Sequence, residues 1–333
     1  MMKSINNFFS YKIVYFFIFI FLLLFLSYLN FSLNKQIYYK NNTSFTIAEG
    51  QTVSKSIQLL KSKKIISSVY RIKILAYIYS INPRFIMGKY EITKNDTEYS
   101  LLIKFIKGKV RQETITIIEG STYANIINAL SNNKFINFND NDHTYYNKDF
   151  HKLNIKNYEG LCFPDTYKYS PGITSQEFLS NCYEKMQYIL LKYWRDRDYS
   201  LPYKTPYEML IMASIIEKES YIVSEKPIIA SVFINRLNTK MRLQADPTVI
   251  YGMKNFTGNI SKKDLRTKNE YNTYRIHGLP KTPICLPGEE SIKAASRPSK
   301  TNYIYFVADK KGRHVFSENY KDHVNAVNKY QKK

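Results

Sequence analysis

Two glutamates in an apolar segment are the side chains of this sequence whose spacing most clearly suggests chemistry. Glu217 and Glu219 flank Lys218 within LIMASIIEKESYI, residues 210–222. At about 100° per residue, helical periodicity places Glu219 on the apolar face and about 20° from Met212, while Lys218 points away and Glu217 lies at the edge. An apolar environment and the negative end of a helix dipole both raise the pKa of a carboxyl group. Glu219 is therefore a candidate general acid.

The same pattern also has a purely structural interpretation. A glutamate on a buried face is usually paired with a cation, because an isolated buried charge is costly. In this interpretation Glu219 forms an ion pair with Arg236 or Arg242, which follow it in the sequence. Periodicity alone does not distinguish a structural ion pair from a catalytic acid.

The helix that must carry the two glutamates has a well-marked start. Thr205 is an N-cap residue, Pro206 suits the first turn, and Glu208 stands three residues after the threonine, which predicts a capping box. The upstream segment from Ser175 to Arg195 predicts a second, longer helix. The apolar residues of the first helix share one broad face; these are Met209, Met212, Ala213, Ile215 and Ile216.

Nearer the N-terminus, one short pattern occurs twice. FTIAEGQTVSKSIQLL runs from Phe45 to Leu60, and ITIIEGSTYANIINAL runs from Ile115 to Leu130. Each copy predicts a strand, a Glu-Gly turn and a helix, with Thr52 or Thr122 as the N-cap residue. A solenoid needs shorter periods and more copies, so we interpret the pair as a duplicated supersecondary unit.

The segments around the second copy complete a mixed pattern of the α+β class. Residues 88–109 predict a strand, a turn at Asn95 and Asp96, and a helix that ends at Gly108. Residues 132–157 are rich in Asn, Asp, Lys and Tyr and have no clear period. We interpret this stretch as loops and short helices that separate an N-terminal domain from a C-terminal one.

The N-terminus predicts a membrane anchor. Residues 13–33 contain no charged side chain, and a helix of this length spans roughly 30 Å, the thickness of the hydrocarbon core. A cleaved signal peptide is the alternative, but no small-residue cleavage site follows. Lysines flank the span almost equally on both sides, so charge does not set the orientation. Residues 1–12 are too few for a domain, so we expect them to be a cytoplasmic tail with the larger part outside the cytoplasm.

Composition excludes some functions. The 333 residues carry a net charge of +22, but the lysines are spread along the chain among Asn, Ile and Tyr, so we predict no nucleic-acid partner.

Cys162, Cys182 and Cys285 have no metal-ligand spacing, and we interpret them as small buried hydrophobes, with a Cys162–Cys182 disulfide as the alternative. His314 and His323 belong to no ligand motif such as H-E-x-x-H. We therefore predict no metal site.

Long motifs downstream resemble a known family. They are YEGLCFPDTYKY (158–169), ASVFINRLNTKMRLQADPTVIYG (230–252), YNTYRIHGLPKTPICLPG (271–288) and AASRPSKTNYIYFVADKKGRHVFSENYKDH (294–323). Together with the E-K-E run and the N-terminal span, they resemble the MltG-type (YceG-like) endolytic murein transglycosylases, which are membrane-anchored bacterial enzymes that cut nascent peptidoglycan strands. The resemblance implies a LysM-like region at residues 40–132, containing the duplicated unit, and a catalytic domain at residues 155–333.

The resemblance also implies site residues. The second acid of the family's E-K-E run is the catalytic one, which here is Glu219, and Glu217 is the weaker candidate, lining the site or supporting it. His314, in the family's H-x-F run, is expected to support the fold or the rim of the site. Substrate contacts are expected from the Q-x-D-P-T and Y-N-T-Y runs, namely Gln244, Asp246, Thr248, Tyr271, Asn272 and Tyr274. The chain departs from the family pattern at Cys162, Lys281, Thr282 and Leu286.

By the same resemblance, one glutamate suffices for the reaction. It protonates the bond between N-acetylmuramic acid and the following N-acetylglucosamine, then accepts a proton from the sugar's own C6 hydroxyl, leaving a 1,6-anhydro end. No cofactor is needed. Expected partners are glycan strands and peptidoglycan synthases of the penicillin-binding class, and the expected location is the bacterial inner membrane with the catalytic domain in the periplasm. The alternative is an inactive, membrane-anchored scaffold that binds peptidoglycan.

Overall fold

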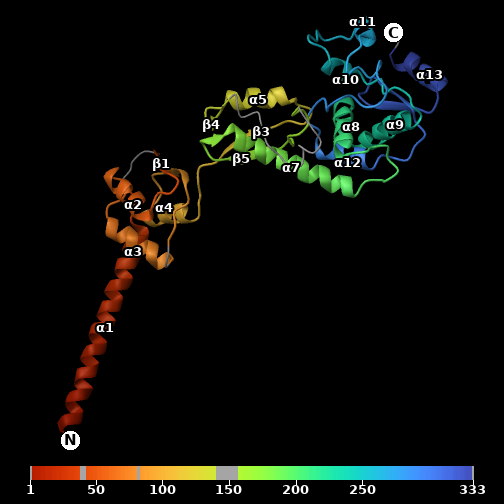
Figure 1. Cartoon of the computed structure of the whole chain (residues 1–333). Coiled ribbons are helices and arrows are strands. Elements are labelled where there is room, and N and C mark those ends of the chain that lie inside the picture. Colours follow the sequence, from red (N-terminus) through yellow and green to blue (C-terminus); the bar gives the residue numbers. More distant parts are fainter. Residues whose placement is uncertain (1, 38–42, 81–82, 140–156, 332–333) are drawn as a thin grey trace. The chain divides into compact units, whose positions relative to one another are not determined.

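The computed structural model describes residues 2–37, 43–80, 83–139 and 157–331. The chain divides into two compact units, Met1–Glu113 and Thr114–Lys333, and mixes helices with short strands (Figure 1). This agrees with the α+β class. Residues 140–156 of the loop segment that the sequence predicts at 132–157 lie outside the described residues, and the division lies earlier in the chain than that predicted boundary. The reason is that the second strand-turn-helix copy packs its apolar face into the core of the C-terminal unit, through Ile117, Ile126 and Leu130.

The first unit begins with one long helix, α1 (Met2–Asn34). Its segment Val14–Asn34 is long and apolar enough to cross a membrane, so α1 fits a single-pass anchor. The folded part that follows contains β1 (Thr43–Ile47), α2 (Val53–Ser62), α3 (Val69–Tyr79), β2 (Gly88–Ile92) and α4 (Glu98–Ile106). β1 and β2 pair antiparallel with Phe45 opposite Tyr90, and both of these side chains enter the core beside Phe105.

The second unit contains short two-stranded pairings and a group of helices. β3 (Glu113–Thr116) pairs with β5 (Thr166–Tyr169), β4 (Ile136–Asn137) pairs in parallel with β6 (Ile173–Thr174), and β7 (Tyr305–Ala308) pairs antiparallel with β8 (His314–Ser317). The helices are α5 (Tyr123–Ser131), α7 (Ser175–Arg195), α8 (Pro206–Glu219), α9 (Lys226–Asn238), α10 (Asp246–Tyr251), α11 (Lys262–Arg266), α12 (Glu289–Ser296) and α13 (Tyr320–Tyr330), with a 3-10 turn η2 (Val223–Glu225).

The duplicated pattern is confirmed as a repeated local structure. In the first copy, Thr52 accepts a hydrogen bond from the backbone of Lys55 at the start of α2. In the second copy, Thr122 does the same with Asn125 at the start of α5. The turn glycines Gly50 and Gly120 have φ of 69° and 76°, a left-handed conformation that glycine adopts without a steric penalty. The sequence therefore encodes each strand-turn-helix unit locally, while side-chain packing assigns the two copies to different units.

α8 occupies the centre of the second unit. It packs against α7, α9, α10 and α12, which lie around it in Figure 1. The predicted helix start is confirmed in part. Thr205 accepts from the backbone N–H of Glu208, but the Glu208 carboxylate accepts from Lys204 N at 2.5 Å, one residue before the position that a capping box requires.

A disulfide corrects our interpretation of two of the cysteines. Cys162 and Cys182, which we expected to be separate buried hydrophobes, are joined to each other. The backbone brings them together, because the N–H of Phe163 donates to the carbonyl of Cys182 at 3.1 Å. Cys285 is a free, buried cysteine.

Candidate active site

Of the two glutamates of the E-K-E run, Glu217 is the more buried one, although helical periodicity predicted that Glu219 would be. Every residue of α8 from Met209 to Glu217 is buried, so this helix has no solvent-facing side between its first and its last turn. There Lys218 is exposed and Glu219 is half-buried. The periodicity argument placed Glu217 at the edge of an apolar face. Because residues on every side of α8 from Met209 to Glu217 are buried, Glu217 is instead the more buried acid.

Glu217 is fully engaged inside the protein. Its carboxylate accepts hydrogen bonds from Lys226 Nζ at 3.1 Å, from the backbone N–H of Gly288 at 3.0 Å and from Ser291 Oγ at 2.5 Å. These contacts link α8 to the starts of α9 and α12. With 3% of its side chain exposed, Glu217 has the surroundings of a structural ion pair rather than of a group that meets a substrate.

Glu219 has no such partners. Within the described part of the chain, its carboxyl group makes no hydrogen bond and no ion pair. Burial raises the pKa of Glu219 to about 8, the negative charge of Asp246 contributes in the same direction, and Arg236 opposes both. At neutral pH this carboxyl group therefore holds a proton that it can donate.

The structural alternative for Glu219 is not realised. Arg236 donates through Nε to the carbonyl of Ile304 at 2.7 Å and through Nη1 to the carbonyl of Leu243 at 2.6 Å. Arg242 is exposed. Arg236 instead anchors the chain just before the Q-x-D-P-T run and remains close enough to Glu219 to affect its pKa.

A buried hydroxyl network fixes the loop that carries Gln244 and Asp246. Thr248 Oγ1 and Thr273 Oγ1 lie 2.8 Å apart, and Thr273 Oγ1 also accepts from the backbone N–H of Ala245 at 2.9 Å. Gln244 has φ of 49°, a left-handed conformation that is uncommon for residues other than glycine. Thr248 is therefore an internal support, whereas the side chains of Gln244 and Asp246 are exposed.

Tyr274 connects the Y-N-T-Y run to the loop that carries Asp246. Its hydroxyl donates to Asp246 Oδ1 at 2.6 Å, and burial raises the pKa of Tyr274, with further contributions from Asp246 and Glu219. The phenol is thus held protonated as a donor beside two acids. The structure brings Glu219, Asp246 and Tyr274 together from segments that are distant in sequence.

The other two residues predicted from this run have different surroundings. Asn272 is fully buried, and its amide donates to the carbonyls of Asp264, Leu265 and Thr267. It therefore shapes the loop rather than contacting the solvent. Tyr271 is half-buried, and its ring packs edge-on against Tyr251 with centroids 4.9 Å apart.

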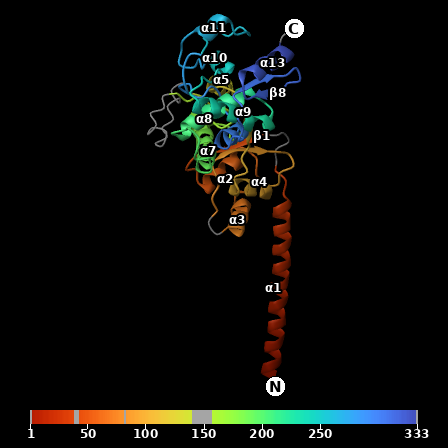
Figure 2. The same ribbon diagram turned by 90° about the vertical axis from the view of Figure 1, so that its right-hand side faces the viewer.

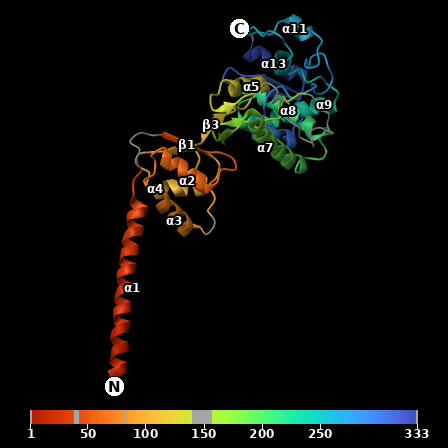
Figure 3. The ribbon, with the colours of Figure 1, turned by 60° about the vertical axis from the view of Figure 1, so that its left-hand side comes forward.

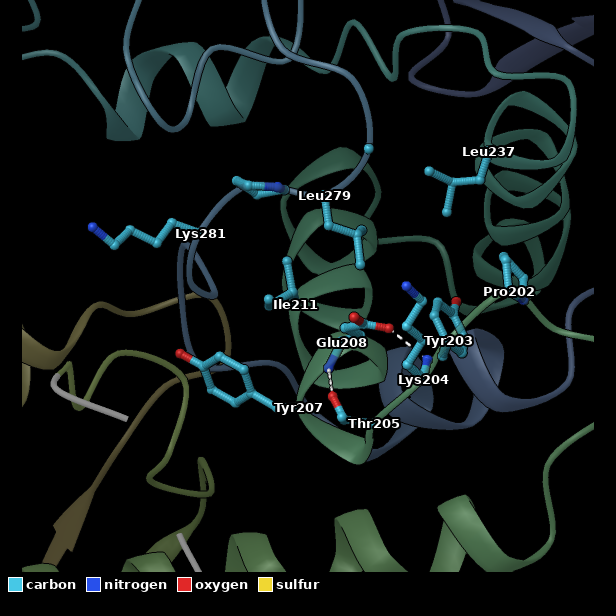
Figure 4. A pocket seen from close by; sticks show the side chains of 12 residues that line it. Pro202, Tyr203, Lys204, Thr205, Tyr207, Glu208, Ile211, Leu237, Leu279 and Lys281 are labelled. Carbon is cyan, nitrogen blue, oxygen red and sulfur yellow. Dashed lines mark hydrogen bonds between the residues drawn. The ribbon is translucent and has the colours of Figure 1, made fainter. Parts of the chain in front are cut away.

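A cavity of about 530 Å³ lies at the other end of α8. Ile211 and Glu208 project from α8 between Tyr207 and Lys281 on one side and Leu237 on the other (Figure 4). Tyr207 precedes Glu219 by twelve positions, so the two lie about 18 Å apart along the helix. The cavity is thus separate from the place where Glu219, Asp246 and Tyr274 meet.

The histidines have structural surroundings. His314 Nδ1 lies 2.7 Å from Glu225 Oε2, which fastens β8 to η2, so the expectation that His314 supports the fold is met. His323 stacks on Tyr305 with centroids 4.9 Å apart. Among the described residues, no group of three or more His, Cys, Asp and Glu side chains is arranged to hold a metal ion.

Comparisons with known proteins identify the family of the chain. The model of the YceG-like family matches residues 45–329. The chain belongs to the YceG-like family. An endolytic murein transglycosylase of Bacillus subtilis is 31% identical over 313 residues, covering 87% of this chain and 85% of that relative. An endolytic murein transglycosylase of Streptococcus pneumoniae is 30% identical over 178 residues, covering 50% of this chain and 31% of its own length.

A solved structure is also similar. The crystal structure of a YceG-like protein from Listeria monocytogenes has a TM-score of 0.53 and 27% sequence identity, covering 86% of this chain and all of that one. Three of the four departures of this chain from the family pattern have local explanations. Cys162 is in the disulfide, Thr282 is buried with its hydroxyl 3.2 Å from that of Tyr271, and Lys281 pairs with Glu270 on the surface.

The turn at Glu119 and Gly120 lies next to the E-K-E run, and the sequence of this YceG-like chain did not predict that proximity. The backbone N–H of Gly120 donates to the carbonyl of Leu286 at 2.9 Å, and Lys218 Nζ donates to the carbonyl of Gly120 at 3.4 Å. Burial raises the pKa of Glu119, with a further contribution from Glu217. The repeat marked this turn as a local structure, but not as part of the end of α8.

Proposed function

We propose that this chain is an endolytic lytic transglycosylase that cleaves the β-1,4 bond between N-acetylmuramic acid and N-acetylglucosamine within peptidoglycan strands. The observation that carries the proposal is Glu219, which is partly exposed, unpaired in the described structure and has a pKa of about 8. Relatives of this chain in Bacillus subtilis and Streptococcus pneumoniae are named endolytic murein transglycosylases, which supports the same activity for this chain.

Glu219 serves both halves of the proposed reaction. In the first half its carboxyl group donates a proton to the glycosidic oxygen as the bond to C1 breaks, so N-acetylglucosamine leaves as an alcohol. In the second half the carboxylate accepts the proton of the C6 hydroxyl of the muramyl residue as its oxygen bonds to C1. The product is a 1,6-anhydro end, and Glu219 is protonated again. Ordinary glycosidases need a second carboxylate, which either attacks the sugar or activates water. Here the intramolecular C6 hydroxyl is the nucleophile and has a high effective concentration, so a second carboxylate is not required.

Asp246 and Tyr274 prepare Glu219 for this cycle. The negative charge of Asp246 raises the pKa of Glu219, so the acid is protonated when the substrate arrives. The same charge favours the positive charge that develops at the sugar ring in the transition state. Tyr274 holds the Asp246 carboxylate through its 2.6 Å hydrogen bond. We propose that Gln244 and Tyr271 contact the glycan from the two adjoining runs.

We further propose that α1 anchors the chain in the bacterial inner membrane with both folded units in the periplasm. The uncharged span supports the anchor, and the Cys162–Cys182 disulfide supports an oxidising compartment. We propose that the folded part of the first unit is the LysM-like, glycan-contacting region. Peptidoglycan synthases are the proposed protein partners, because they supply nascent strands to an enzyme on the same membrane.

Digestion of purified peptidoglycan by the full-length protein in detergent tests the proposal. Mass spectrometry of the released fragments should identify internal cleavage and new 1,6-anhydro-muramyl ends. Reducing ends would indicate a hydrolase instead. Binding to peptidoglycan with no new ends of either kind would support the alternative of an inactive scaffold.

A further inference from the structure

Helix α3 exposes apolar side chains to an unusual extent. Its buried side, formed by Ile72, Leu75 and Ala76, faces the core of the first unit. The opposite side carries four large residues within an arc of about 100° by helical periodicity. These residues, which we name the α3 outer face, are Tyr70, Ile74, Tyr77 and Ile78, with exposed fractions of 80%, 43%, 64% and 56%. A helix that is apolar on both sides normally has partners on both sides.

The α3 outer face lies next to the end of the apolar span. The guanidinium of Arg71, the neighbour of Tyr70, lies over the ring of Phe31 of α1 at 5.7 Å from its centroid. Figures 1, 2 and 3 show α3 on the side of the first unit from which α1 extends. The α3 outer face is therefore adjacent to the surface of a membrane that α1 crosses, at the C-terminal end of α1.

No free linker separates α1 from the folded part of the first unit. Ser32 is fully buried although it lies in the last turns of α1. Immediately after the helix, the carbonyl of Lys35 accepts from the backbone N–H of Glu98 at 2.8 Å, and Gln36 forms a β-bridge with Thr97. These contacts hold the folded part directly at the end of the span.

The composition of the face matches a lipid interface. Tyrosine is enriched where hydrocarbon meets headgroups, because its ring is apolar and its hydroxyl is polar. Lys73 borders the face, and Lys61, Lys63 and Lys64 precede α3 in the sequence. Apolar side chains bordered by cations are typical of helices that lie in the plane of a membrane surface.

We propose that α3 lies in the interface of the membrane that α1 crosses, with the α3 outer face inserted among the lipids of the leaflet on the side of the folded units. The inference rests on the proposed anchoring by α1. It adds a second membrane contact, which fixes the rotation and tilt of the first unit, α1 included, relative to the membrane.

Tryptophan fluorescence of the full-length chain in lipid vesicles tests the contact. Trp194 is replaced by phenylalanine, and a new tryptophan is introduced by Tyr77→Trp or, as a matched control, by Tyr188→Trp in α7. Tyr77 and Tyr188 are 64% and 70% exposed, so neither substitution disturbs a core. Vesicles contain phosphatidylcholine and phosphatidylglycerol, with and without bromine on the acyl chains.

We expect the emission of the Tyr77→Trp protein to shift to shorter wavelength and to be quenched by brominated lipid, most strongly by bromines near the headgroups, because interfacial side chains reach about 5–10 Å below the surface. The Tyr188→Trp emission should show neither effect. Equal quenching at both positions, or none at position 77, would overturn the inference. A blue shift without quenching would show that a protein partner or a second copy covers the face, and would also overturn it.

Flotation of the same samples separates this inference from the proposed anchor. A chain that fails to float with the vesicles contradicts anchoring by α1. A chain that floats but shows no quenching at position 77 leaves the anchor intact and contradicts the α3 contact alone.

Discussion

Glu217 and Lys226 form an ion pair with 3.1 Å between Oε2 and Nζ, in which each side chain is 3% exposed. Removing one partner of such a pair leaves the other charge buried and uncompensated. We therefore expect Glu217→Gln to lower the free energy of unfolding by about 3–5 kcal/mol. Urea denaturation followed by circular dichroism measures the change.

Glu270→Gln is the matched control for that substitution. Glu270 pairs with Lys281 on the surface, where the two side chains are 64% and 61% exposed. Exposed pairs contribute about 0–1 kcal/mol, so this variant should unfold close to wild type. Equal losses for the two variants would refute a structural role for the buried pair.

The raised pKa of Glu219 predicts a pH-dependent effect on stability. The folded protein binds this proton with a pKa of about 8 against an ordinary value of 4.5, so between these values the folded state holds more protons than the unfolded one. Stability from this group is therefore present at low pH and is lost as pH rises through the folded pKa. Glu219→Gln has no such ionisation, so its stability relative to wild type should be greater at pH 9 than at pH 5. A difference that is constant with pH would count against the shift.

Asp246 should control the pH range of activity. Because Glu219 must begin the reaction protonated, we expect kcat/KM to fall at alkaline pH with an apparent pKa near 8. Asp246→Asn removes a negative charge that raises this pKa, so the alkaline limb should move to lower pH. Glu318→Gln makes the same change of charge at an exposed acid and should leave the limb in place. An unmoved limb in the Asp246 variant would show that another group sets it.

The disulfide should contribute to stability in oxidising conditions. Cys162 and Cys182 are 20 positions apart, and closing a loop of this size contributes about 3 kcal/mol in the chain-entropy model. We expect dithiothreitol to lower the melting temperature of the wild type and to leave a Cys162→Ala/Cys182→Ala variant unchanged. A wild type that is insensitive to complete reduction, verified by thiol counting, would contradict this.

Much of the local structure could be predicted from the sequence. The bounds predicted for α7, Ser175 to Arg195, are those of the structure, and Thr205 caps α8 as expected. Such features depend on caps and periodicity, which neighbouring residues encode. The assignment of the second repeat copy to the C-terminal unit depends on contacts of Ile126 and Leu130 with residues far along the chain, and periodicity does not contain that information.

The sequence predicted the main acid of the candidate site, Glu219, but not the burial of the residues around it. Periodicity and family resemblance both selected Glu219, but the argument from one apolar face failed for Glu217, because every side of α8 between Met209 and Glu217 is buried. Thr248 and Asn272 belong to motifs expected to contact substrate, yet both are fully buried and bond to backbone carbonyls. A motif identifies residues that matter, but burial decides which of them support the loop and which reach the solvent.

Replacement of Glu219 by glutamine tests the central claim most directly. The amide keeps the size of the side chain but can neither donate nor accept the catalytic proton, and Glu219 has no partner in the described structure whose loss would unfold the protein. Glu208→Gln, at a half-buried acid near the start of the same helix, is the control. Peptidoglycan digests of both variants are analysed for 1,6-anhydro ends, and thermal unfolding is recorded on the same samples. We expect Glu219→Gln to fold normally and to lose about 10⁴-fold in rate, the upper end for acid–base participation, while Glu208→Gln stays near wild type. A folded Glu219→Gln protein that forms anhydro ends at a near wild-type rate would contradict the account.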